Sequence, residues 1–345
     1  MATAAQRRIK SVSYAKYGYI FILPFFIVYF LFMVYPLFET FRMSLYGNGA
    51  DKDSIKLGIS IQHYMGFQNF RDILFKDGRN TADFFASIKN TLIIWGGNFL
   101  PQISLSLLLA VWFTDLNVKM PGKGFFKVVM YMPNIITATS VAGLFYTLLG
   151  ADTSSVWYTI FHGPKSNFDQ NLLLGLTSVW PARLIVMFIQ IWMWFGNTMI
   201  MLMSGIQGIN ESLFEAAEID GTNAHQTFWR ITFPLLKTIM VYTLLTSMIG
   251  GLQMFDIPYM LNGGTIIPSI KTVACFIYEK ATGTKAAKAY GWAGAASVIM
   301  FFITAILGAL VFYVQRDKDA IEKKRKRKEA MKEAKRRARG GGFSI

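Results

Sequence analysis

The feature that most constrains this chain is a series of long apolar runs that contain no charged residue. Six runs are close to the roughly 20 residues that an α-helix needs to cross a bilayer. They cover residues 19–38, 92–113, 128–149, 184–203, 238–255 and 292–314. No water solvates the backbone at that depth, so each run is predicted to be helical, and none alternates as a transmembrane β-strand does. The sequence predicts an all-α polytopic membrane protein with six transmembrane helices.

Composition supports this prediction. With 53% hydrophobic and 16% charged residues among 345, the chain is too apolar for an ordinary soluble domain. Pro24, Pro101 and Pro133 fall within or near the apolar runs and are expected to kink them. The first run is too long for the core of a secretory signal and has no small-residue cleavage site, so a retained helix is expected.

Both ends of the chain are basic, which predicts their side of the membrane. Residues 1–18 are basic, and residues 316–345 hold 13 Lys or Arg against 5 Asp or Glu, within a total net charge of +15. The short segment with Lys119, Lys123 and Lys127 falls on the same side as the two ends. By the positive-inside rule, both termini are expected to be cytoplasmic, flanking a membrane domain at 19–315. The long segment 39–91 constrains the orientation only weakly.

Cysteine and histidine usage limits other chemistry. The single Cys275 excludes an internal disulfide, and three distant histidines show no metal-ligand spacing, so no metal site is predicted. The basic clusters of the tail are not interleaved with aromatic residues in a pattern that would stack on bases, so contact with anionic membrane lipid is expected rather than nucleic-acid binding.

A polar stretch, "EAAEIDGTNAHQTFWRITFP", separates the fourth and fifth runs on the predicted cytoplasmic side. Asn210 can cap a helix, and Glu211, Glu215 and Glu218 then lie along one stripe of it. Gly221 can take the positive φ that ends such a helix, and Pro234 leads into the fifth predicted span. We expect a short surface helix fixed to a span at each end, over about 210–234, which suits the transmission of force.

This stretch resembles the EAA loop of binding-protein-dependent ABC importer permeases. Its pattern is E-A-A, three residues, Gly, nine residues, then I-x-L-P, and here Phe233 replaces the Leu. Asn210 stands where related sugar permeases often have Pro. The segments "YMGFQNF", "NTLIIW", "FFKVVMYMPNII", "FDIPYMLNGGT" and "YGWAGAAS" resemble the sugar branch, which includes maltose and glycerol-phosphate permeases.

The resemblance implies a type I importer transmembrane domain with a cytoplasmic coupling helix, in a bacterial cytoplasmic membrane. Its partners would be a second homologous permease, a dimer of ATP-binding cassette ATPases, an extracytoplasmic solute-binding protein and a carbohydrate solute. Likeness to the branch implies an oligosaccharide. Coupling to the ATPase would fall on Glu215, Ala216, Ala217, Asp220 and Gly221. The chain has no Walker A pattern, so ATP and Mg²⁺ are expected on the partner, with no cofactor in this chain.

Amides and aromatic rings inside the spans are candidates for the solute pathway, because buried polar groups tend to face an interior cavity. These candidates are Asn98, Gln102, Asn134, Gln190, Trp194 and Asn197. Gln190, Trp194 and Asn197 share one helical face. Hydrogen bonding between helices is the alternative role for any one of these amides.

Two other functional classes were weighed against an import subunit. A stand-alone ion-coupled secondary transporter would use intramembrane Asp, Glu or His residues as a relay, and the six runs contain none. An intramembrane enzyme would need a nucleophile and a base within the bilayer, and no such pair is evident. Neither the solute nor the identity of the ATPase follows from the sequence.

Overall fold

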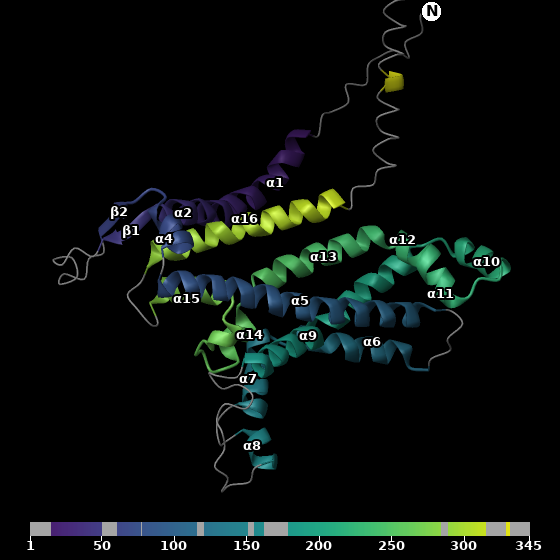
Figure 1. Ribbon diagram of the computed structural model, residues 1–345. Helices are drawn as coiled ribbons and strands as arrows, with labels where there is room; N and C mark the ends of the chain where they lie inside the picture. Colours follow the sequence, from purple (N-terminus) through teal and green to yellow (C-terminus); the bar gives the residue numbers. More distant parts are fainter. Residues whose placement is uncertain are drawn as a thin grey trace, which may run out of the picture. The chain divides into compact units, whose positions relative to one another are not determined.

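The computed structural model describes residues 15–49, 61–76, 78–115, 121–150, 155–161, 179–283, 289–314 and 329–331 (Figure 1). Most of the basic N-terminal segment and of the basic tail therefore lies outside the described residues. The chain divides into two compact units, one formed by 1–87 and 273–300 and the other by 88–272 and 301–345.

The regular structure is almost entirely helical. Its elements in chain order are α1 (Ala15–Tyr29), η2 (Phe30–Val34), α2 (Tyr35–Ser44), β1 (Tyr46–Gly49), β2 (Ile61–Tyr64), α4 (Gln68–Phe75), α5 (Arg79–Thr114), α6 (Lys123–Tyr131), η3 (Met132–Ile135), α7 (Ala138–Leu149), α8 (Val156–Phe161), α9 (Val179–Gln207), α10 (Glu211–Ile219), α11 (Ala224–Thr227), η4 (Phe228–Thr232), α12 (Phe233–Leu235), α13 (Lys237–Leu252), α14 (Asp256–Met260), η5 (Pro268–Ile270), α15 (Val273–Thr282) and α16 (Tyr290–Val314).

Among the described residues, five stretches are helical, long and apolar enough to cross a membrane: Tyr17–Ser44, Arg79–Thr114, Val179–Gln207, Lys237–Met260 and Tyr290–Tyr313. The sixth predicted span is a pair of helical pieces, Lys123–Ile135 and Ala138–Leu149, that meet at 90°. Figure 1 shows α7 turning away from the direction of α6. The kink expected at Pro133 is thus present as a break within the run 128–149, and the six apolar runs are largely helical within the described residues.

Proline explains the break in the third run. Pro133 lies in the 3-10 turn η3, where its missing N–H and its ring prevent continuation of an α-helix. Ile136 and Thr137 are extended, and Thr137 restarts the chain as the cap of α7 by accepting from Ser140 N–H at 3.3 Å. Pro24 and Pro101, in contrast, lie inside the assigned α-helices α1 and α5.

Two other prolines follow π-helical turns. η2 ends two residues before Pro36, and η4 ends two residues before Pro234. A proline has no N–H for the carbonyl four residues earlier and its ring crowds that carbonyl, so a wider turn upstream accommodates it. The second of these turns lies between the predicted coupling helix and the fifth span.

The unit formed by 1–87 and 273–300 contains more structure than the loop expected over 39–91. β1 and β2 pair antiparallel with Tyr46 opposite Tyr64. Asn69 Nδ2 donates to the carbonyls of Ser44 and Tyr46 at 2.8 and 3.0 Å. Gly291 packs so closely that an added Cβ would collide with the Tyr46 carbonyl oxygen. The resulting core fixes the hairpin against the beginning of α16.

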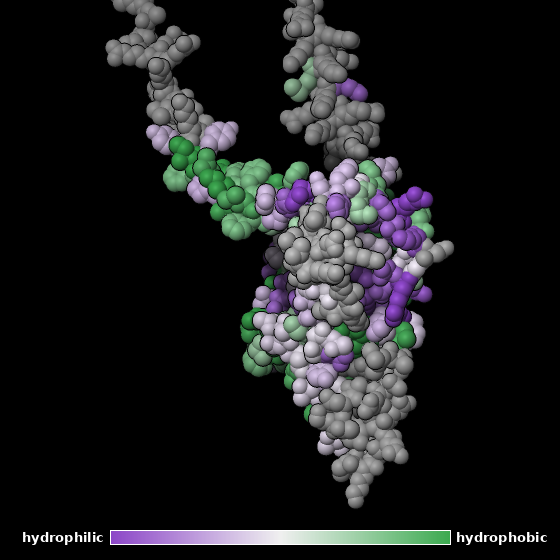
Figure 2. All heavy atoms as spheres, turned by 90° about the vertical axis from the view of Figure 1, so that its left-hand side faces the viewer, coloured by the Kyte–Doolittle hydropathy of each residue, from purple (hydrophilic) through white to green (hydrophobic). Residues whose placement is uncertain are grey.

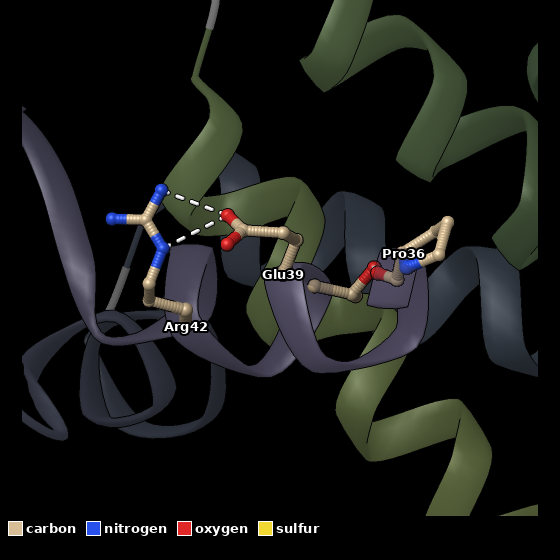
Figure 3. A network of polar contacts seen from close by, with 4 residues as sticks. Pro36, Glu39 and Arg42 are labelled. Atoms are coloured by element: carbon tan, nitrogen blue, oxygen red, sulfur yellow. Dashed lines mark hydrogen bonds and ion pairs between the residues drawn. The ribbon is translucent and has the colours of Figure 1, made fainter. Parts of the chain in front are cut away.

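The end of α2 carries a local polar network (Figure 3). Arg42 donates from Nε and Nη2 to one carboxylate oxygen of Glu39, each at 2.8 Å, and Thr40 Oγ1 donates to the Pro36 carbonyl. N-terminal to this network, α1 exposes aromatic and aliphatic side chains along its length, including Phe21 and Phe25 (Figure 2). Apolar residues over a whole helix surface are typical of contact with lipid or with another membrane helix.

Apolar clusters lie among the described residues of the unit formed by 88–272 and 301–345. One includes Ile94, Val186, Ile189 and Ile267, and another includes Leu109, Met199, Leu202 and Leu236. Small residues allow close approach between its helices. A Cβ at Gly196 of α9 would collide with the Met130 carbonyl oxygen of α6, and one at Gly205 would approach Leu236. Close helix contact at glycine is the packing mode that membrane interiors favour.

Candidate functional site

α10 begins where the sequence predicted. Asn210 is extended and its side-chain oxygen accepts from the Ser212 N–H at 3.2 Å, which satisfies one of the free donors of the first turn. Glu211 adds a negative charge in that turn, where it complements the helix dipole. The predicted cap is confirmed, and Figure 1 shows α10 and α11 past the ends of α9 and α13.

α10 ends in a Schellman motif at Gly221. The Gly221 N–H donates to the Glu218 carbonyl and the Thr222 N–H donates to the Ala217 carbonyl, each at 3.0 Å. Gly221 has φ +70°, which confirms the predicted left-handed turn. A Cβ added there would have no atom within 4 Å, so the requirement for glycine is conformational and not steric.

The chain after the turn is also tightly capped. Thr222 Oγ1 donates to the Ala217 carbonyl at 2.8 Å, and lies 2.9 Å from the Thr227 hydroxyl. Asn223 and Gln226 form a reciprocal capping box at the start of α11. The path from α10 through α11 to α13 thus has consecutive hydrogen-bonded turns, which fix the direction of α10 relative to α13.

Four carboxylates of this segment, Glu211, Glu215, Glu218 and Asp220, are exposed. Within the described residues none of them forms an ion pair. Ile219, between two of these acids, is 86% exposed. α10 therefore presents an acidic surface with an accessible apolar side chain, which fits a partner surface that is basic with an apolar contact.

The two alanines of the predicted docking element differ in position. Ala216 is exposed, whereas Ala217 is only 5% exposed. The Ala217 carbonyl also accepts from both the N–H and the hydroxyl of Thr222. Ala216 is thus accessible to a partner, while Ala217 packs inward and supports the turn.

A cluster of rings follows α11. Trp229 lies 5.0 Å from both Phe228 and Phe233 between ring centroids, and His225 lies 6.3 Å from it. Trp229 is 51% exposed. An aromatic ring with an exposed polar edge is suited to the boundary between lipid and water.

The predicted pathway residues separate into two groups. Asn98 and Gln102 of α5 are buried at 4% and 6% exposure, and Gln102 Nε2 donates to Thr198 Oγ1 at 3.1 Å. Ser106 adds a bond to the Phe195 carbonyl at 2.8 Å. The α5–α9 contact thus includes polar bonds between helices, and Gln102 has the structural role that was the alternative to solute contact.

The other group lies at accessible positions. Gln190 and Asn197 are half-buried and Trp194 is 45% exposed, all on one face of α9. Asn134 is half-buried in η3, at the break between α6 and α7. This face of α9 has amides and an indole available to a ligand or to a second subunit.

Sequence reasoning missed a polar cluster at the first turns of α9. Arg183 Nη2 donates to Asn90 Oδ1 at 2.6 Å, and its Nε donates to the Ser269 carbonyl at 3.0 Å. Asn90 Nδ2 donates in turn to the carbonyls of Pro268 and Lys271 at 2.9 and 3.1 Å. Arg183 lies seven residues before Gln190, which places both on one face of α9, and this spacing was the signal that could have identified Arg183.

Across the described ranges, no group of three or more His, Cys, Asp or Glu side chains is suited to hold a metal ion.

With this geometry established, comparison with known sequences defines the family. The family described as "Binding-protein-dependent transport system inner membrane component" matches residues 102–320, more than half of the chain. The chain belongs to this family. It is therefore an inner-membrane, multi-pass permease component of a binding-protein-dependent transport system, as the EAA-loop resemblance implied.

Several relatives of this permease have named transport systems. The Lactose transport system permease protein LacF of Rhizobium radiobacter is 26% identical over 325 residues, which cover 92% of this chain and 100% of that protein. The Arabinooligosaccharides transport system permease protein AraP of Bacillus subtilis is 27% identical over 267 residues, covering 75% and 77%. The Multiple sugar-binding transport system permease protein MsmF of Streptococcus mutans is 28% identical, covering 72% and 79%.

Solved structures show the same fold. A chain of a bacterial ABC transporter involved in the import of the acidic polysaccharide alginate matches with a TM-score of 0.68 and 22% identity, covering 87% of this permease and 95% of that chain. A chain of the alginate ABC transporter in complex with its periplasmic protein bound to alginate pentasaccharide also matches with a TM-score of 0.68, at 24% identity, covering 90% and 98%. The fold class predicted from the sequence is thereby confirmed as that of an ABC importer transmembrane subunit.

Proposed function

We propose that this permease is one of two different membrane subunits of an ATP-driven importer for a carbohydrate, and that it forms half of the translocation pathway. The observation that carries the coupling role is α10 itself. It is a capped helix with exposed carboxylates, joined without a flexible gap to α9 and α13. Closure of a partner ATPase can displace such a helix and, through it, both spans.

The solute class follows from the relatives and from the α9 face. Lactose, arabinooligosaccharide and multiple-sugar systems are named for the relatives. Gln190, Trp194 and Asn197 provide amides and an aromatic ring, which suit contact with a sugar. The six apolar runs contain no Asp or Glu, which fits transport without ion coupling. We assign an oligosaccharide as the transported class.

The assembly contains a dimer of ATPases, which bind ATP and Mg²⁺, and a second homologous permease. One EAA loop contacts one ATPase, so two permeases serve the ATPase dimer. An extracytoplasmic binding protein delivers the solute to the side opposite α10, and both termini of this chain are cytoplasmic.

Reconstitution into liposomes tests the proposal. ATP-dependent uptake of a labelled oligosaccharide is expected only when this chain, the second permease, the ATPase and the binding protein are all present. Native mass spectrometry is expected to show one copy of each permease with two ATPase copies. Uptake by this chain alone, driven by an ion gradient, would instead establish a secondary transporter, and a functional homodimer would contradict the two-permease assignment.

A further inference from the structure

The guanidinium of Arg183 has N–H donors that no described residue accepts. Arginine carries five N–H donors. One bond from Nε reaches the Ser269 carbonyl and one from Nη2 reaches Asn90. Among the described residues no acceptor meets the other three N–H groups, which include both of Nη1. The Arg183 side chain is half-buried, so these donors are accessible to a ligand, whereas the neighbouring Asn90 is buried.

The positive charge of Arg183 also has no carboxylate partner among the residues that the structure describes. Both of its acceptors are neutral, and no described carboxylate forms an ion pair with it. Burial of a cation is unfavourable unless an anion compensates it. An arginine held by neutral groups at this end of α9 can therefore accept the negative charge of a bound ligand.

The position of the guanidinium is fixed by its neighbours. Asn90 is 3% exposed and is itself held by the carbonyls of Pro268 and Lys271. On its other side, Arg183 lies over the ring of Trp180 at 5.4 Å, and Trp180 is 59% exposed. A fixed guanidinium fork next to an exposed indole ring matches the two parts of an acidic sugar, its carboxylate and its ring.

Arg183 is aligned with the pathway candidates. At about 100° per residue, Arg183, Gln190, Trp194 and Asn197 fall within an arc of roughly 60° on α9. Seven residues separate Arg183 from Gln190, a rise of about 10 Å along the helix. One oligosaccharide can therefore contact the cation with one sugar unit and the amides with another.

We propose that Arg183, with Trp180, is a binding site for a sugar carboxylate, so that the transported glycan contains uronic acid. This inference rests on the proposed function, because it specifies the chemistry of the solute. It places the acidic unit at the end of α9 opposite α10, where an arriving solute first meets the bundle.

The test uses the complete permease–ATPase complex in lipid nanodiscs, without the binding protein. Trisaccharides that contain galacturonate, glucuronate or mannuronate are each compared with the neutral trisaccharide of the same linkage, and affinity is measured by the thermal shift of the complex. We expect at least one acidic trisaccharide to bind about tenfold more tightly than its neutral counterpart. Arg183→Gln should remove that preference, and Arg183→Lys should keep part of it.

Lys89→Gln is the matched control, because Lys89 is an exposed cation beside Asn90 and its loss changes the net charge equally. It should leave the preference intact. The inference is overturned if no acidic trisaccharide shifts the complex up to its solubility limit, if acidic and neutral forms bind equally, or if Arg183→Gln lowers stability without changing the preference.

An effect of Arg183→Gln that appears only when the binding protein docks would assign the arginine to a carboxylate of that protein, and would also overturn the inference. Efficient ATP-dependent uptake of a neutral glycan, with no preference for the acidic form, would overturn it while leaving the proposed function intact.

Discussion

The two ends of α9 are held by different kinds of interaction. At the α10 end, every fixing bond joins residues within a few positions: Asn210 to Ser212, Ala217 to Thr222, and Asn223 to Gln226. At the other end, Arg183 and Asn90 donate hydrogen bonds to the segment around Ser269, which lies 86 to 181 positions away in the sequence. One end is a set of local caps, and the other is a junction of three distant segments.

This difference has a mechanical consequence. Local caps fix the shape of the α10–α11 segment itself, so the segment can move as a body without losing its hydrogen bonds. The junction at Arg183 ties α5, α9 and η5 to one another, so relative motion there must break bonds. We therefore expect changes at the junction and in the bundle to alter stability, and changes in the α10 turn to alter coupling with smaller effects on stability.

The largest effect is expected from Gly196→Ala, which affects a long-range contact along α9. The added methyl group would collide with the Met130 carbonyl oxygen and lie 2.9 Å from the Tyr131 Cα, and backbone atoms cannot move aside cheaply. A loss of about 3 kcal/mol is expected, seen as a marked fall in membrane abundance and thermal midpoint. Gly96→Ala is the control, since a Cβ there has no atom within 4 Å. Equal abundance of the two variants would contradict the packing.

Asn90→Ala should have the next largest effect, of about 2 kcal/mol. It removes the bonds to Arg183, Pro268 and Lys271, which join α5 to α9 and to the segment around η5 at a buried position. The measurement is the thermal midpoint of the purified complex together with protease sensitivity of the segment around η5. Asn90→Asp keeps the acceptor for Arg183 and should therefore lose less stability than Asn90→Ala. Unchanged protease sensitivity in Asn90→Ala would show that the junction does not hold this segment.

Gly221→Val should cost about 1–2 kcal/mol, because a β-branched residue is strained at a φ of +70°. The turn that directs α10 would be reshaped, so uptake and copurification of the ATPase should fall while the chain still inserts. Gly221→Asn, which tolerates a left-handed conformation, should retain most of the activity. Full uptake by the valine variant would show that the turn is not needed for transmission.

Asn210→Ala should have the smallest effect, about 1 kcal/mol at most, because it removes one cap bond from an exposed helix start. Uptake is expected to fall modestly with no change in membrane abundance. Asn210→Ser provides another capping oxygen and should retain normal uptake. If alanine and serine variants behave alike, the cap does not contribute to coupling.

The same contrast explains what the sequence could predict. The Asn210 cap, the Gly221 turn and the six apolar runs depend on residue types at short spacing, so the sequence predicts them. The bond between Gln102 and Thr198 and the cluster around Arg183 depend on which helices become neighbours, which no short spacing encodes. The kink near Pro133 was predicted from the sequence, whereas its 90° angle was not, because a proline indicates a disturbance of the helix without fixing the size of the bend.

The separation of the two alanines is another such case. Ala216 and Ala217 are equivalent in the motif, yet only packing decides that the first is exposed and the second is buried.

The central claim is that the exposed surface of α10 contacts the ATPase, and thiol labelling tests it most directly. Cysteine is introduced at Ala216 or at Ile219, which is 86% exposed, in a chain whose buried Cys275 is replaced by alanine. Labelling by a membrane-impermeant maleimide is compared in inverted vesicles with and without the ATPase. We predict fast labelling of both cysteines in the permease pair alone and strong protection when the ATPase is bound. A cysteine at Lys237, exposed on α13, should label equally in both conditions. Equal labelling at Ala216 and Ile219 with and without bound ATPase would contradict the claim.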